Sequence, residues 1–425
     1  HDGMGRWNED GQVDLWQYPK NCDELNSHQG TACTYGGNSG RQPSFNPQGF
    51  TFTQAGNGTA GFADGDSTTA MFRAPDDVAA DQYGWLYVAD TMNNAIRMVH
   101  NVTGVVSTLA GRGPDTKGPR DGNCSYATFT EPRGLDVEVR DIDGFETTVV
   151  VVADTGNHRI RRINYVRHTG ECEVVCLSGL CGNNTLSFTQ YNTKATPYTG
   201  YADGNGLESR FSAPEGVAFM DGHAVAVADT GNFLIRYILD NGTTSTLAGR
   251  VVPGQTGPDG NPAGGCQPPC LEGQEGFFDG NLTHAMFMNP VDLTRGTNNT
   301  LYITDEHRIR LIEMPNVNTT LYTHESQGRV STVVGTGRQG HEDGLAKDGA
   351  TVFNPSGVTV TADSRVYFVD SASCRVRRLT PLPLVVEELT CLDTVTKYMR
   401  PSGCTSFDQP IDLTGRKITR TEANL

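Results

Sequence analysis

Short apolar or alternating runs, separated by polar turns, occupy most of this chain. The best-defined stretch lies between residues 200 and 248 and contains four such runs in succession. Their lengths and their content of Val, Ala, Ile and Leu are typical of β-strands, and the turns between them contain Asp-Gly, Thr-Gly-Asn and Asn-Gly. The runs are Gly216–Met220, His223–Asp229, Leu234–Leu239 and Thr243–Ala248. This pattern predicts a four-stranded antiparallel meander.

The same pattern occurs five times along the chain. In each copy a Gly-rich turn precedes a Phe and a Pro, a hydrophobic strand then ends in Asp, and an Arg follows a few residues later. A single meander cannot bury both of its faces, whereas meanders arranged radially cover one another. We therefore predict an all-β chain folded as a β-propeller of four-stranded blades.

Four residue types mark each copy. The Pro stands just before the first strand, where a missing N–H costs the sheet nothing, and the Phe is expected to lie between neighbouring blades. The Asp is expected to accept hydrogen bonds from the turn that follows it, and the Arg to reach a neighbouring carboxylate. Because these residues recur in every copy, we assign them a structural role. They are Phe72, Phe129, Phe211, Phe287 and Phe353; Pro75, Pro132, Pro214, Pro290 and Pro355; Asp90, Asp154, Asp229, Asp305 and Asp370; and Arg97, Arg161, Arg236, Arg310 and Arg377.

Three of the copies resemble NHL repeats. They read LYVADTMNNAIRMV (86–99), VVADTGNHRIRRI (151–163) and VAVADTGNFLIRYI (225–238), and STLAG occurs at 107–111 and 245–249. The fourth copy is shortened to ITDEHRIRLI (303–312), and the fifth, FVDSASCRVRRL (368–379), has Cys374 where Asn or His is usual in the family. The resemblance covers about residues 50 to 380 and implies a propeller fold. We expect residues 50–380 to form the propeller, between extensions at 1–49 and 381–425.

Closure of the ring has two candidates. Phe50–Ala55 precedes the first Gly-rich turn as STLAG precedes later ones, so it is expected to complete the last blade without a free sheet edge. Leu384–Leu389 could instead begin a degenerate sixth blade. We favour five blades and keep six as the alternative.

The sequence also carries features of an extracellular glycoprotein. It has eleven Cys, mostly outside the predicted strands, where disulfides would hold the long insertions and terminal extensions. The disulfide candidates are Cys22, Cys33, Cys172, Cys176, Cys181, Cys266, Cys270, Cys391 and Cys404. N-glycosylation is expected at the Asn-x-Ser/Thr sequons Asn57, Asn101, Asn123, Asn183, Asn241, Asn281, Asn298 and Asn318. Asn123 is the weakest of these because Cys124, in the middle position, could enter a disulfide.

The cysteines also raise the question of zinc. A C-x3-C spacing occurs at Cys172/Cys176 and at Cys266/Cys270, but no second ligand pair follows at finger spacing, so we favour disulfides. The odd number of cysteines leaves one thiol free, paired between chains, or bonded to a part of the protein beyond this sequence.

Charge and hydropathy exclude two classes of partner. The formal net charge of −16 repels phosphate backbones, which argues against the RNA-binding role of some cytosolic NHL propellers. No apolar stretch approaches eighteen residues, so this segment is not expected to insert into a membrane. Because the chain begins at His1, we expect a mature or truncated product.

The inner starts of the blades are the best place for a site. Two residues after the motif Pro, two copies carry Asp77 and Asp292 where the other copies carry Gly. These carboxylates could line the channel mouth and bind Ca²⁺, although solvated rim charges are the simpler explanation and no cofactor is required. A zinc lyase of the peptide-amidating type, which uses a related propeller, would need several converging His. His158, His223 and His307 are instead expected on peripheral loops.

Three functions therefore remain. The first is a non-enzymatic extracellular module that binds proteins or self-assembles, as in a repeating subunit of a glycoprotein fibre, sheath or surface coat. The second is an extracellular metal-dependent lyase or hydrolase with its site at the channel mouth. The third is a receptor ectodomain.

Overall fold

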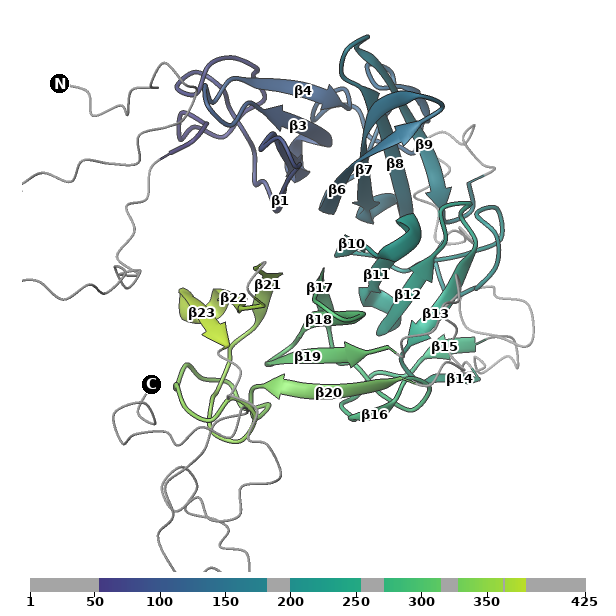
Figure 1. The fold of residues 1–425 in the computed structure, drawn as a ribbon, viewed down its shortest axis with the longest axis vertical. Helices are drawn as coiled ribbons and strands as arrows, with labels where there is room; N and C mark the ends of the chain where they lie inside the picture. The colour runs from purple at the N-terminus through teal and green to yellow at the C-terminus, as the bar shows by residue number, and fades with distance from the viewer. Residues whose placement is uncertain (1–52, 182–198, 254–270, 315–327, 362–363, 380–425) are drawn as a thin grey trace, which may run out of the picture. The chain divides into compact units, whose positions relative to one another are not determined.

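The structure is a computed structural model that describes residues 53–181, 199–253, 271–314, 328–361 and 364–379. Its strands form five antiparallel blades, as predicted, and the first strand of each blade lies innermost (Figure 1). Blades 1 and 3 have four strands each. Blade 1 consists of β1 (Asp77–Ala80), β2 (Leu86–Asp90), β3 (Ala95–Val99) and β4 (Val106–Ala110), and blade 3 of β10 (Val217–Phe219), β11 (Val225–Asp229), β12 (Leu234–Ile238) and β13 (Thr244–Ala248).

Blades 2 and 4 each gain a short fifth strand on the outer edge. Blade 2 consists of β6 (Pro132–Ile142), β7 (Phe145–Asp154), β8 (Arg159–Val166) and β9 (Glu171–Ser178), with β5 (Gly122–Asn123) outside them. Blade 4 consists of β17 (Pro290–Arg295), β18 (Thr300–Asp305), β19 (Arg308–Glu313) and β20 (Arg329–Val334), with β16 (Gly280–Asn281) outside them. A separate hairpin pairs β14 (Val251–Pro253) with β15 (Leu271–Gly273).

Blade 5 has three strands among the described residues: β21 (Pro355–Val360), β22 (Val366–Asp370) and β23 (Arg375–Leu379). The predicted closing strand is only partly described. Thr53–Ala55 lie outside any strand, and residues 50–52 and 384–389 are outside the described ranges. Closure therefore stays a prediction, to which we return below.

The hydrophobic core lies between adjacent blades. Ala89 and Ile96 of blade 1 pack with Val150 and Val152 of blade 2, and similar clusters join blades 2 and 3, 3 and 4, and 4 and 5. The motif Phe occupies these clusters in the middle blades, as Phe129, Phe211 and Phe287.

The fifth copy departs from this pattern. Its Phe353 stands two residues before the Pro instead of three, so Val352 takes the fully buried place and Phe353 is only half-buried. The shorter spacing between Phe353 and Pro355 is the reason for the difference.

The repeated Arg bridges two carboxylates in every blade. In blade 3, Arg236 lies 2.7 Å from Asp229 at the end of the second strand and 2.6 Å from Asp203 in the Asp-Gly turn. Asp229 also accepts hydrogen bonds from the backbone N–H of Ser212 and the side chain of Asn232. The backbone donor therefore lies before the first strand, in the residue after the motif Phe, and not in the following turn as the sequence suggested.

The other blades repeat this arrangement. The Arg–Asp–Asp sets are Arg97 with Asp90 and Asp64, Arg161 with Asp154 and Asp121, Arg310 with Asp305 and Asp279, and Arg377 with Asp370 and Asp343. The role of the turn Asp is a finding of the structure, although its recurrence in each Asp-Gly turn was visible in the sequence.

Candidate functional site

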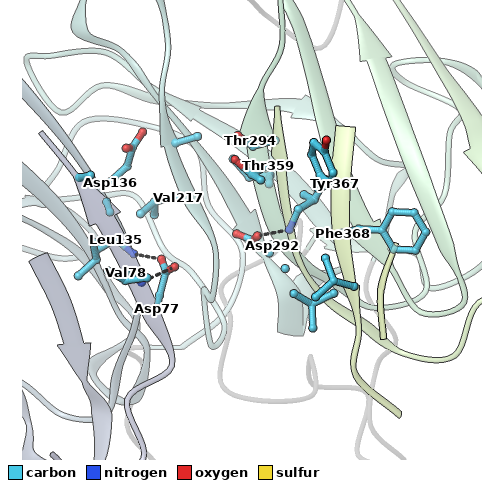
Figure 2. Close-up of a pocket in the computed structure, with 18 residues that line it drawn as sticks. Asp77, Val78, Leu135, Asp136, Val217, Asp292, Thr294, Thr359, Tyr367 and Phe368 are labelled. Carbon is cyan, nitrogen blue, oxygen red and sulfur yellow. Dashed lines mark hydrogen bonds between the residues drawn. The ribbon is translucent and has the colours of Figure 1, made fainter. Parts of the chain in front are cut away.

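The innermost strands of the five blades surround the central cavity. A cavity of about 490 Å³ is lined by residues of β1, β6, β10, β17, β21, β22 and β23 (Figure 2). A second cavity of about 600 Å³ lies beside it and shares Asp77, Val78, Asp292, Gly357 and Val369 with the first. The second cavity also reaches Asp76, Arg133 and Glu215, at the end of the blades where the first strands begin. We call this end of the blades the mouth end and the opposite one the far end.

Three carboxylates in the cavity connect one blade to the next. Asp77 of blade 1 accepts a hydrogen bond of 2.8 Å from the backbone N–H of Leu135 in blade 2 (Figure 2). In the same way, Asp136 of blade 2 accepts one of 2.7 Å from Phe219 N in blade 3. Asp292 of blade 4 accepts one of 2.8 Å from Val358 N in blade 5. Because the blades are separate sheets, no sheet hydrogen bonds join them, and these side chains supply hydrogen bonds from one blade to the next.

Glycine joins the blades differently. Gly134 donates its N–H to Glu215 O of blade 3 at 3.0 Å, and a Cβ at Gly134 would lie 2.2 Å from the same oxygen. A Cβ at Gly216 would lie 2.7 Å from Val291 O of blade 4. The sequence showed Asp at two of these positions and Gly at the others. The structure shows why: glycine permits direct backbone contact, whereas Asp77 and Asp292 span the gap with a side chain.

Burial and mutual repulsion raise the pKa values of these carboxyl groups. Burial, and then the charge of Asp77, raises the pKa of Asp292 to about 8. Burial is also the main cause for Asp136, whose pKa rises to about 6, and for Asp77, whose pKa is likewise raised. At neutral pH this cavity therefore binds protons more tightly than ordinary surface carboxylates would.

The mouth end carries a mixed charge cluster. Arg133 lies 3.5 Å from the carboxylate of Glu215 and 3.8 Å from that of Asp76. Burial raises the pKa of Glu215, which the charge of Arg133 partly offsets. Both ion pairs are partly exposed, so they offer a partner charged contacts at little cost in the stability of the fold.

The predicted calcium candidates do line one cavity. Asp77 and Asp292 already accept backbone hydrogen bonds across blade boundaries, and this accounts for their presence at the inner strands. Within the described ranges no group of three or more His, Cys, Asp or Glu side chains is placed to hold a metal ion. Calcium binding stays a proposal, in which the carboxylate oxygens of Asp77 and Asp292 would be the ligands.

The sequence did not lead us to predict Asp136 as a member of this site. It lies in β6, within the otherwise apolar start Gly134–Val137, and its charge among inward-facing apolar residues was the available signal. The histidines lie elsewhere and contact neighbouring blades. His158 Nδ1 accepts the N–H of Ala213 at 2.9 Å, and burial lowers its pKa, while His223 Nδ1 lies 2.9 Å from the Glu138 carboxylate.

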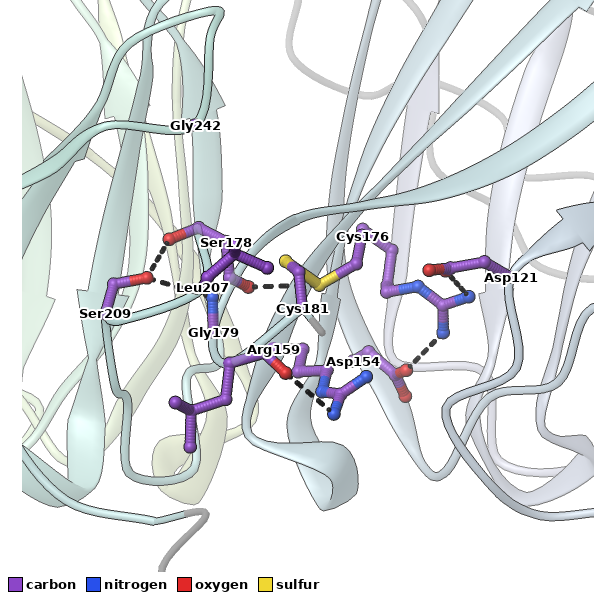
Figure 3. Close-up of a disulfide and its surroundings, with 12 residues drawn as sticks. Asp121, Asp154, Arg159, Cys176, Ser178, Gly179, Cys181, Leu207, Ser209 and Gly242 are labelled. Atoms are coloured by element: carbon purple, nitrogen blue, oxygen red, sulfur yellow. Dashed lines mark hydrogen bonds and ion pairs between the residues drawn. A yellow bond between two sulfur atoms is a disulfide. The ribbon is translucent and has the colours of Figure 1, made fainter. Parts of the chain in front are cut away.

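Two disulfides lie within the described ranges. Cys124–Cys172 joins the outer turn of blade 2 to β9, and Cys176–Cys181 links β9 to the segment that leads away from it (Figure 3). Cys172 and Cys176 thus form disulfides with different partners, so this C-x3-C pair does not bind zinc. Such bonds are typical of a protein that folds in an oxidising compartment. Cys374 is exposed and carries a free thiol. The remaining predicted cysteines, Cys22, Cys33, Cys266, Cys270, Cys391 and Cys404, lie outside the described ranges.

Six of the eight sequon asparagines are described, and all six are exposed. Asn101 and Asn241 lie in the turns between third and fourth strands, and Asn298 lies in the turn between β17 and β18. Asn123 and Asn281 pair with residues at the beginning of fourth strands, Glu173 and Arg329. Asn101, Asn241 and Asn298 therefore belong to the far end. Asn123 and Asn281 lie at the outer edge of the blades, where the next residues, Cys124 and Leu282, accept hydrogen bonds from Gly111 and Gly249 after the fourth strand of the preceding blade. Asn57 follows Gly56, and Asn183 and Asn318 fall outside the described ranges.

Comparison with known proteins finds similar sequences and similar solved structures. The chain is 26% identical over 333 residues to the protein SUPPRESSOR OF QUENCHING 1, chloroplastic, of Arabidopsis thaliana, covering 75% of this chain and 26% of that protein. It is 36% identical over 102 residues to human NHL repeat-containing protein 2, covering 24% of this chain and 13% of the relative. Among solved structures, an auxiliary nutrient binding protein from Bacteroides ovatus is 18% identical with a TM-score of 0.37, covering 62% of this chain and 49% of that one.

The chain spans about a quarter of the length of the plant protein and about an eighth of the human one. No family model matches the chain. In the part of the chain that the structure describes, no helix is long and apolar enough to cross a membrane.

Proposed function

The chain is an NHL-type β-propeller, and we propose that it is an extracellular glycoprotein module that binds other proteins or assembles with copies of itself, without catalysing a reaction. The observation that carries this proposal is the placement of its sequons. Three exposed sequon asparagines stand in far-end turns, Asn101, Asn241 and Asn298, and two more, Asn123 and Asn281, stand at the outer edge of the blades.

Glycans at these positions would cover the far end and the outer edge and leave most of the mouth end accessible. Among the described sequons only Asn57, which follows Gly56, lies on the mouth side. The mouth end offers the features of a protein-binding surface: a cavity of about 600 Å³ and the charged groups of Asp76, Arg133 and Glu215. Single exposed residues in the turns after second strands, Met92 and Gly231 among them, lie at the same end. The net charge of −16 and the glycans would keep such a protein soluble while one end engages a partner.

The buried carboxylates support a structural role for the cavity. Asp77, Asp136 and Asp292 each hold the next blade through a backbone N–H, so their position follows from the assembly of the ring. A lyase or hydrolase would need carboxylates that are free to act on a substrate. For this reason we place the binding function at the mouth end and assign no catalytic residue. A fibre, sheath, surface coat or receptor ectodomain would all use the module in this way.

Peptide mapping of the chain secreted from eukaryotic cells tests the proposal. Enzymatic deglycosylation converts a glycosylated Asn to Asp, and we expect conversion at most of the eight sequons. Asn123 is expected to be modified least, because Cys124 in the middle position is bonded to Cys172. Conversion at two or fewer sites would overturn the extracellular assignment.

A further inference from the structure

The outer edge of β23 in blade 5 lacks a partner strand among the described residues. Its residue Val376 is 74% exposed, and Val369, which pairs with it across β22 and β23, is 42% exposed. The residues that correspond to Val376 in the other blades are fully buried; they are Ile96, Ile160, Ile235 and Ile309. Blade 5 is thus uncovered at a position where every comparable blade has a covering strand and a neighbour.

Asp343 indicates which residue the missing strand supplies. In blade 1 the equivalent Asp64 binds Arg97 and also accepts hydrogen bonds from the backbone N–H and the hydroxyl of Thr108 in β4, at 3.1 and 2.9 Å. Asp203 with Thr246 and Asp279 with Thr332 repeat this pairing. In blade 5 the Asp343 side chain binds Arg377 and is 95% exposed. In blade 2 the residue opposite the repeated Arg is Cys176. The three Asp–Thr pairs therefore predict a Thr opposite Arg377 in the strand that completes blade 5.

Gly56 shows where that strand is in the sequence. Each comparable fourth strand ends in a glycine with a positive φ that donates its N–H to the next blade, as Gly111 does to Cys124 O, Gly249 to Leu282 O and Gly335 to Ala346 O. Gly56 has a φ of 107° and donates to Ser67 O at the start of blade 1. The residues before Gly56 therefore have the position of the fourth strand in the blade that precedes blade 1 around the ring, which is blade 5.

The local sequence agrees. Thr53-Gln54-Ala55-Gly56 corresponds to Thr108-Leu109-Ala110-Gly111, so Thr53 falls at the position of the predicted Thr. Gln54 O lies against Gly104 of blade 1, and Leu109 O lies 3.9 Å from Cys172 Sγ, the corresponding residue of blade 2. The competing segment 384–389 contains no Thr.

Blade 1 has the complementary open face. Val78 is 57% exposed, whereas its equivalent in blade 2, Leu135, is buried against blade 1. Residues of blades 1 and 5 line the same two cavities, Val78 and Val369 among them. The two open faces therefore border the central cavity of one molecule.

We propose that Thr53–Ala55 is the fourth strand of blade 5 in the same molecule, with Thr53 opposite Arg377 and hydrogen-bonded to Asp343. Ala55 then lies opposite Val376, as Ala110 lies opposite Ile96. The added strand covers Val376 and brings the Val369 face of blade 5 onto the Val78 face of blade 1, which closes the ring at five blades. This inference does not depend on the proposed partner-binding function.

A cysteine pair in the expected register tests the closure. Ala55→Cys with Val376→Cys, made in a Cys374→Ser background, should form a disulfide within one chain, detected by non-reducing electrophoresis and peptide mapping. Ile96→Cys with Ala110→Cys is the matched control, because these residues pair in blade 1. Disulfides between chains would show that the edge takes the strand of a second copy, and no disulfide where the control forms one would show that the strand lies elsewhere. Either result overturns the proposal.

A double-mutant cycle gives a second test that needs no new covalent bond. Thr53→Val removes the hydrogen bond of the Thr hydroxyl to Asp343 and should lower the equilibrium constant for folding about tenfold. Asp343→Ala removes the same hydrogen bond together with the Arg377 ion pair, so in an Asp343→Ala background Thr53→Val should have little further effect. Thr108→Val with Asp64→Ala provides the same cycle inside blade 1. A Thr53→Val chain as stable as the parent in urea would overturn the proposal.

Discussion

The carboxylate of Asp292 in blade 4 accepts a hydrogen bond of 2.8 Å from the backbone N–H of Val358 in blade 5. The side chain lines the cavity and is partly exposed to it; burial of the carboxyl raises its pKa, and the nearby charge of Asp77 raises it further. A propeller has no sheet hydrogen bonds between blades, so this contact holds the two inner strands together. The same surroundings make the ionised form of the Asp292 carboxyl less favourable. The balance between these effects depends on pH.

We predict that the propeller becomes less stable as the pH rises towards 8. The pKa of Asp292 is about 8 in the folded chain, whereas that of an unperturbed Asp in the unfolded chain is 3.8. The folded state therefore holds a proton that the unfolded state has lost over most of this range, and the stability that it contributes declines as the pH approaches 8. Asp136, with a pKa of about 6, adds to the decline below pH 6. Melting temperatures at pH 5, 6.5 and 8 measure the effect.

Asp292→Asn should flatten this pH dependence, because it keeps an acceptor oxygen and carries no charge. The difference in melting temperature between Asp292→Asn and the parent is expected to be more positive at pH 8 than at pH 5. Asp66→Asn is the control, since hydrogen bonds from Thr68 lower the pKa of that exposed carboxyl out of the tested range. An unchanged slope in Asp292→Asn would show that other groups set the pH dependence.

The buried Arg of each blade should be essential for stability. Arg236 is fully buried between Asp229 and Asp203, so Arg236→Met leaves the buried Asp229 carboxylate without its charge partner and should cost about 3–5 kcal/mol in the free energy of unfolding. Arg295→Met removes a largely exposed pair with Asp221 and should cost no more than about 1 kcal/mol. Urea titration of both variants measures the difference. Equal losses would contradict the structural role assigned to the repeated Arg.

The sequence predicted the repeat and the fold because the blade motif recurs in every copy. It placed the four strands of blade 3 to within two residues, since Gly- and Asn-containing turns bound each run. It did not predict that Asp136 joins the cavity, because a hydrogen bond from Asp136 to Phe219 N spans two blades and 83 residues. It also missed the bond of Cys124 to Cys172, since no spacing rule identifies partners 48 residues apart.

The two disulfides should differ in their contribution to stability. Cys124–Cys172 closes a loop of 48 residues and Cys176–Cys181 one of 5. The chain-entropy relation gives about 4 kcal/mol for the longer loop and about 2 kcal/mol for the shorter one. Replacing both cysteines of each pair by Ser, followed by urea titration, measures these losses. A larger loss for the Cys176–Cys181 pair would mean that its contact between β9 and the segment after it outweighs loop closure.

The last prediction concerns the mouth end as the surface for association. Ser371 is exposed in the turn between β22 and β23, at the mouth end, and Ser371→Asn creates the sequon Asn-Ala-Ser with Ser373. A glycan there should block a partner by its bulk, so we expect glycosylated Ser371→Asn to be monomeric in light scattering where the parent is oligomeric. The double change Ser371→Asn with Ser373→Ala keeps the new Asn without the sequon and should assemble like the parent. If glycosylated Ser371→Asn still assembles, the association surface lies elsewhere. A parent chain that is monomeric by itself would leave binding to other proteins, and not self-assembly, as the role of the propeller.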